Sequence, residues 1–125
     1  MGPRMSVVVL FGSTEESRVA VTHSVAEATR RQVRLHVLAA NDLAHEEAET
    51  LLPSEVGQSK VSWALHEVPA NLGQVYALLD LATQVDADVI VVGTQRRSAV
   101  GKLLMGSLAQ EILLGSLVPV LLVKP

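Results

Sequence analysis

Short aliphatic runs alternate along this chain with longer segments whose apolar residues recur at helical spacing, and this alternation restricts the fold more than any other feature. The strand-like runs are residues 6–12, 32–40, 60–68, 88–93 and 118–124. Continuous runs such as SVVVLFG and DVIVVG are typical of parallel strands covered on both faces. Strands that alternate with helices predict right-handed βαβ crossovers and a parallel sheet with helices on both sides.

The helical segments carry start and stop signals of different strength. Ser13 and Glu16 fit a capping box that opens a helix reaching about Arg31. Two turns of helix are expected over 45–52, where Pro53 would end them. Pro69 fits the first turn of the next helix, whose apolar stripe continues to about Val85. A last helix is expected from about Leu104, with Gly115 able to terminate it.

Composition narrows the function classes. The chain has 125 residues, of which 49% are hydrophobic and 2% aromatic, so an aliphatic core is expected and sequential base stacking on aromatic platforms is excluded. The net charge of −3 provides no general attraction to nucleic acid or to a membrane surface. The absence of Cys excludes disulfides and thiolate chemistry, and it fits a cytoplasmic protein. No apolar run reaches the roughly 18 residues that a membrane-spanning helix requires.

Acidic and histidine residues indicate no catalytic centre. His23, His36, His45 and His66 are scattered without a zinc-binding spacing, and we interpret them as structural or surface residues. The acidic residues at 46–49 are typical of a solvated helix face. No nucleophile–base pair can be identified, so no enzymatic reaction is predicted.

The segment GTQRRSAVGKLLMGS, residues 93–107, is the strongest candidate for a binding loop. In parallel sheets, ligands bind beyond the carboxyl ends of the strands, and this segment leaves such an end. Gly106 and Ser107 at a helix start could offer backbone N–H groups to a phosphate, with Arg96 adding charge. The segment contains neither a Walker A motif nor G-x-G-x-x-G, so a plain βα loop with glycines for turn geometry remains the alternative.

Nearly the whole chain resembles a universal stress protein domain. The matching segments are VVVLFGSTEESRVAV, VRLHVLAA, DADVIVVGT, RSAVGKLLMGSLAQEILLGS and VPVLLVKP. The resemblance implies an α/β, Rossmann-like fold of the adenine-nucleotide α-hydrolase type, with five parallel strands in the order 3-2-1-4-5. It assigns residues 6–125 to the domain and leaves residues 1–5 as an N-terminal arm or an expression remnant.

Many family members bind ATP or AMP through G-x-x-G, nine residues and G-(S/T), whereas others lack this motif. Gly93, Gly106 and Ser107 match it, but Arg96 occupies the second glycine position. Binding members usually end the first strand with Asp-Gly-Ser, whereas this chain has Phe there, which removes an acceptor for the adenine amine. The residues expected around a ligand are Phe11, Gly12, Ser13, Ala39, Gly93, Thr94, Arg96, Gly106 and Ser107.

These departures leave two functional hypotheses. The first is a dimeric regulatory or interaction module of the universal stress type, with nucleotide binding weakened or lost and with other proteins as partners. The second is an ATP- or AMP-binding sensor that uses residues 93–107 as its phosphate cradle. Slow ATP hydrolysis is a third reading that no residue supports. The resemblance also implies a homodimer formed through the last strand, 118–124.

Overall fold

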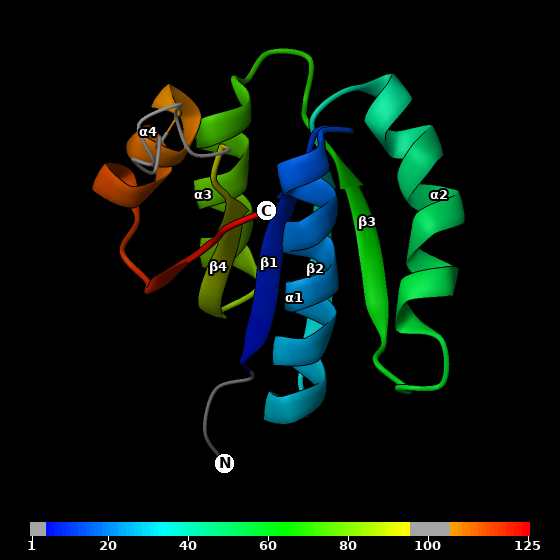
Figure 1. Ribbon diagram of the computed structural model, residues 1–125. Helices are drawn as coiled ribbons and strands as arrows, with labels where there is room; N and C mark the ends of the chain where they lie inside the picture. The colour runs from blue at the N-terminus through cyan, green and yellow to red at the C-terminus, as the bar shows by residue number, and fades with distance from the viewer. Residues whose placement is uncertain (1–4, 96–105) are drawn as a thin grey trace, which may run out of the picture.

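The computed structural model describes residues 5–95 and 106–125, and it consists of one parallel sheet between two layers of helices (Figure 1). The strands are β1 (Ser6–Phe11), β2 (Arg34–Ala39), β3 (Trp63–Glu67), β4 (Ala87–Gly93) and β5 (Val120–Val123). The helices are α1 (Glu15–Arg31), α2 (Asp42–Val56), α3 (Gln74–Gln84) and α4 (Ser107–Gly115). The predicted α/β class, and the strand-helix alternation behind it, are therefore confirmed.

The sheet has the order β3-β2-β1-β4-β5, as the resemblance implied. The central strand β1 is fully buried and pairs in parallel with β2 and β4, because its continuous aliphatic run faces helices on both sides. Alternate residues of β1 enter two separate cores. Val7, Val9 and Phe11 pack toward α1 and α2, whereas Val8 and Leu10 pack toward α3 and α4.

Two helices differ from the expectation. The helix α2 begins after the cap residue Asn41 and contains Pro53, rather than covering only 45–52. Pro53 lies in the last turn, and its carbonyl accepts a hydrogen bond from the Gly57 N–H. The proline has no N–H of its own to donate, so the helix loses one hydrogen bond but continues past it. Pro69 does not open α3 but lies in a turn that the Leu72 N–H closes, and the helix begins after Gly73.

The fold places the starts of helices and the ends of strands at one edge of the sheet. The carboxyl ends of the strands lie at the top of Figure 1, where α1 and α2 begin. The order of the strands reverses between β1 and β4, since β1 leads outward to β2 whereas β4 leads outward to β5. Ligand sites in parallel sheets form at such reversals. None of the helices in the described ranges is long and apolar enough to cross a membrane.

Candidate functional site

A cavity of about 280 Å³ lies at the reversal between β1 and β4. Its walls come from the ends of the strands β1, β2 and β4 and from the starts of the helices α1, α2, α3 and α4. The described residues that line it are Leu10, Gly12, Thr14, Glu16, Ser17, Ala40, Asn41, Gln74, Val92, Gly93, Gln95, Gly106, Leu108 and Ala109. Three of the predicted site residues, Gly12, Gly93 and Gly106, are therefore brought together at one cavity.

The four helix starts differ in how their free N–H groups are satisfied. The Asn41 side chain accepts a hydrogen bond from the Ala44 N–H at 2.8 Å and caps α2. In contrast, α3 and α4 begin at Gly73 and Gly106 without a side-chain cap. Because the first N–H groups of a helix have no partner within the helix, the start of α4 can donate to an anion in the cavity.

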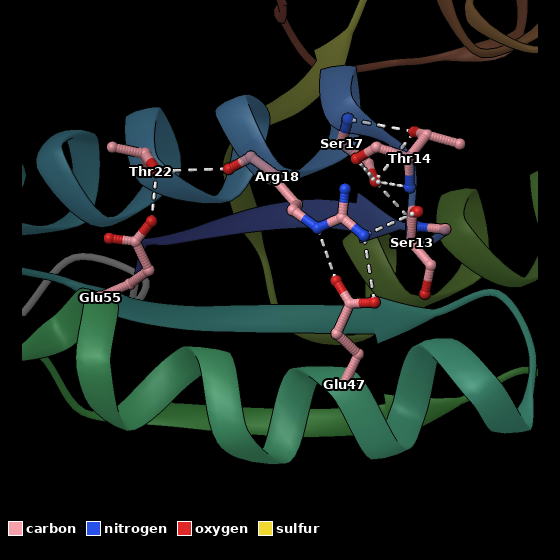
Figure 2. Close-up of polar contacts among 8 residues, drawn as sticks. Ser13, Thr14, Ser17, Arg18, Thr22, Glu47 and Glu55 are labelled. Carbon is pink, nitrogen blue, oxygen red and sulfur yellow. Dashed lines mark hydrogen bonds and ion pairs between the residues drawn. The ribbon is translucent and has the colours of Figure 1, made fainter.

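The turn from β1 to α1 is built around a capping box of Thr14 and Ser17 (Figure 2). The Thr14 Oγ1 accepts from the Ser17 N–H at 3.2 Å, and the Ser17 Oγ accepts from the Thr14 N–H at 3.1 Å and from the Gly12 N–H at 3.2 Å. The predicted box of Ser13 and Glu16 is wrong by one residue. Ser13 has φ 62° and turns the chain instead, so its hydroxyl cannot cap the helix.

Ser13 does not line the cavity. Its Oγ is buried and has no hydrogen-bond partner among the described residues. The carbonyl of Ser13 accepts from Arg18, which also forms a two-pronged ion pair with Glu47 of α2 at 2.6 and 3.2 Å (Figure 2). The hydrogen bond from Arg18 lowers the pKa of the Glu47 carboxyl. This ion pair connects α1 to α2 behind the β1–α1 turn.

Two predicted site residues belong to the core instead. Phe11 is fully buried and Ala39 is 1% exposed, and both pack on the side of the sheet that α1 and α2 cover. They are paired across β1 and β2, and neither lines the cavity. Their neighbours Gly12 and Ala40 line it, because alternate residues of a strand face opposite sides of the sheet. Phe11 therefore fills the core at the point where binding members of the family carry a carboxylate.

The remaining predicted residues lie away from the cavity or outside the described residues. Thr94 is fully buried, and both its N–H and its Oγ1 donate to the Val123 carbonyl, at 2.8 and 3.1 Å, so it fastens β5 to β4. Ser107 begins α4 but is exposed and does not line the cavity. Arg96 lies outside the described residues.

Gly93 has a steric role at the cavity. A Cβ atom at this position would lie 2.1 Å from the carbonyl oxygen of Glu16 and 2.5 Å from its carbonyl carbon. Real Cβ atoms do not approach backbone so closely, so only glycine allows β4 to end against the first turn of α1. At Gly106, a Cβ would meet the Gln95 Nε2 at 3.2 Å, which places the Gln95 side chain against the start of α4.

Sequence reasoning missed the polar side chains of the cavity. They include the amides of Asn41, Gln74 and Gln95, together with Glu16. Asn41 could have been predicted from the sequence, since it follows the end of a strand and precedes a helix, as N-cap residues do. Gln74 and Gln95 carry no such signal, because their place depends on where α3 and α4 begin in space.

Comparisons with known proteins agree with this architecture. A curated universal stress protein from Mycolicibacterium smegmatis is 37% identical over 127 aligned positions, covering 95% of this chain and 97% of the relative. The chain belongs to the universal stress protein family. The family model for universal stress proteins matches residues 73–124, which contain α3, β4, α4 and β5.

Solved structures of this family share the fold. The universal stress protein from Archaeoglobus fulgidus has a TM-score of 0.79 at 23% identity, with 99% of this chain and 100% of that chain covered. A structure described as the Archaeoglobus fulgidus protein in complex with dAMP has a TM-score of 0.71 at 21% identity, with the same coverage. At these identities the likeness establishes the five-stranded fold alone.

Proposed function

We propose that residues 6–125 form a regulatory universal stress domain that acts as a homodimer, binds an adenine nucleotide only weakly in the cavity between β1 and β4, and catalyses no reaction. The observation that carries the proposal is the lining of the cavity. Its described walls offer amides, small residues and the open start of α4, but no Lys, Arg or His. Such walls can hold a nucleotide, but their described residues contribute no positive side-chain charge to its phosphates.

The base side of the cavity supports weak rather than tight binding. Because Phe11 is turned into the core, β1 presents no carboxylate to an adenine amine. Loss of one such specific polar partner costs about 1–3 kcal/mol, or roughly tenfold to a hundredfold in affinity. A site that would otherwise bind at micromolar concentration would then require nucleotide at roughly 10–100 times that level.

The alternative is an ATP or AMP sensor that uses residues 93–107 as a phosphate cradle. The uncapped α4 start at Gly106 favours it, as does the Archaeoglobus fulgidus relative described in complex with dAMP. In both hypotheses the protein is a cytoplasmic regulator with protein partners. The absence of Cys supports that location, since reducing compartments do not maintain disulfides.

Calorimetric titration with AMP and with Mg-ATP separates the two hypotheses, after acid release and chromatography have shown whether a nucleotide co-purifies. We expect an AMP dissociation constant of hundreds of micromolar or more and no co-purified nucleotide. Micromolar binding of Mg-ATP would contradict weak binding and support the sensor. Absence of heat with both ligands up to millimolar concentration would overturn nucleotide binding altogether.

A further inference from the structure

Glu16 is the only residue with an ionisable side chain among the described residues that line the cavity. It belongs to the first turn of α1, two residues after the cap residue Thr14. Negative charge is favoured near the start of a helix. No hydrogen bond or ion pair joins that carboxylate to another residue in the described ranges.

Glu16 lies directly against the end of β4. Its carbonyl group and its Cβ lie against Gly93 at the end of β4, within 2.1–3.1 Å of the position that a Cβ at Gly93 would take. Two residues later, the side chain of Gln95 lies against Gly106 at the start of α4. Glu16, the end of β4 and the open start of α4 therefore form one continuous wall.

This wall combines two opposite electrostatic effects. The start of α4 attracts an anion, and the carboxylate of Glu16 repels it. Repulsion between like charges increases with every phosphate charge brought into the cavity, and it is stronger in a partly enclosed site than in water. A nucleoside has no such charge, a monophosphate has one to two, and a triphosphate has up to four.

We infer that Glu16 is a specificity-determining residue that makes the cavity disfavour ligands in proportion to their phosphate charge, so that adenosine and AMP are preferred to ATP. The inference rests on the proposed function, because it requires a nucleotide in this cavity. It also gives that function a cause for weak ATP binding that is independent of Phe11.

The test uses the full chain with Glu16→Gln and the matched control Glu15→Gln. Glu15 and Glu16 both lie in the first turn of α1, so each substitution removes one favourable charge from the helix start, but only Glu16 lines the cavity. Dissociation constants for adenosine, AMP and ATP are measured by NMR titration in EDTA, since a divalent cation would mask the phosphate charge. Thermal unfolding of both variants serves as the folding control.

We expect Glu16→Gln to tighten ATP binding about tenfold, equivalent to about 1.4 kcal/mol. AMP binding should tighten about threefold, adenosine binding should stay unchanged, and Glu15→Gln should change none of the three by more than twofold. If the wild type binds nucleotide and the two variants behave alike, the role of Glu16 is overturned while the proposed function stands. If neither the wild type nor Glu16→Gln binds any of the three ligands at millimolar concentration, the proposed function and the inference both fail.

Discussion

At the end of β4, the backbone of Gly93 lies so close to the backbone of α1 that a side chain at this position would prevent the site from forming. Among the described glycines that line the cavity, only Gly93 has an added Cβ that would overlap a backbone atom, at 2.1 Å from the Glu16 carbonyl oxygen. Gly12 lies on the same cavity, but its added Cβ would meet only the Ala40 Cβ at 3.9 Å, an ordinary contact. Gly93 is therefore required by its close backbone neighbour, whereas Gly12 is not required for steric reasons.

We predict that Gly93→Ala destabilises the fold by about 3 kcal/mol or more, because the clash requires β4 or α1 to move within a packed sheet. Gly12→Ala should cost less than about 1 kcal/mol, since its neighbours leave room for a methyl group and its φ is not positive. Urea unfolding at pH 7 measures both. Equal losses for the two variants would contradict a steric role that is specific to Gly93.

The residues of the site illustrate what a sequence pattern can and cannot locate. Gly93 and Gly106 could be placed because the family motif has fixed spacing around a strand end and a helix start. Phe11 and Ala39 lie in the core and not at the cavity, because the resemblance marks the end of a strand but not which face of the sheet each residue takes. Glu16 was expected to cap α1 because Ser13 looked like the cap, and the left-handed conformation of Ser13 cannot be read from its type.

At the scale of elements, all five strands were predictable from aliphatic runs of the right length, and α1 from its small-residue pattern. The helix α2 was underestimated because Pro53 was read as a stop, although a proline in the last turn removes only one hydrogen bond. The sequence also gave no sign that His36 of β2 and His66 of β3 meet, since pairing depends on the register of two strands that are distant in the chain.

His36 Nδ1 and His66 Nε2 lie 2.9 Å apart and share one hydrogen bond across the β2–β3 pair. Burial, with the positive charges of a protonated His66 and of Arg34 opposing a further proton, lowers the pKa of His36 to about 4. Burial and Arg34 lower the pKa of His66 as well. Glu67 and Asp80 belong to the neighbouring surface around His66. In an unfolded chain both histidines would bind protons with a pKa near 6.5.

We therefore predict that stability falls as the pH decreases from about 6.5 toward 4, because the unfolded state binds more protons than the folded state in this window. Well above pH 6.5 the histidines are neutral in both states, and their pKa difference no longer lowers the stability of the fold. From pH 7 to pH 5 the loss should be about 1–2 kcal/mol. The variant His36→Gln is expected to show a smaller loss across the same interval, although it is less stable at pH 7. The exposed His23→Gln serves as control and should keep the wild-type slope.

For the whole molecule, the two edges of the sheet are covered unequally. The edge strand β3 packs against α2, through Trp63 and Leu65 in the same core as Ala48 and Leu52. The other edge strand, β5, is four residues long and has β4 as its single strand partner among the described residues. Leu121 of β5 is exposed, as are Leu114 of α4 and Leu117 in the connection between α4 and β5. An exposed apolar edge strand invites pairing with another chain, and a second copy satisfies it by two-fold symmetry.

The hydrogen bonds of β5 provide a sharp test of such a dimer. The Pro119 carbonyl accepts a hydrogen bond from Ile90 of β4, and the Val123 carbonyl accepts one from Thr94, which follows β4. The alternate residue Leu122 therefore directs its N–H away from β4. We predict that Leu122→Pro gives a folded monomer by light scattering at micromolar concentration, with a stability loss of about 1–2 kcal/mol, because proline removes a donor only from the open edge. Leu121→Pro should cost several times more, since that N–H faces β4. Should Leu122→Pro remain a dimer, or should the wild type already be a monomer, the partner copy does not bind through β5, and the exposed leucines must serve another contact.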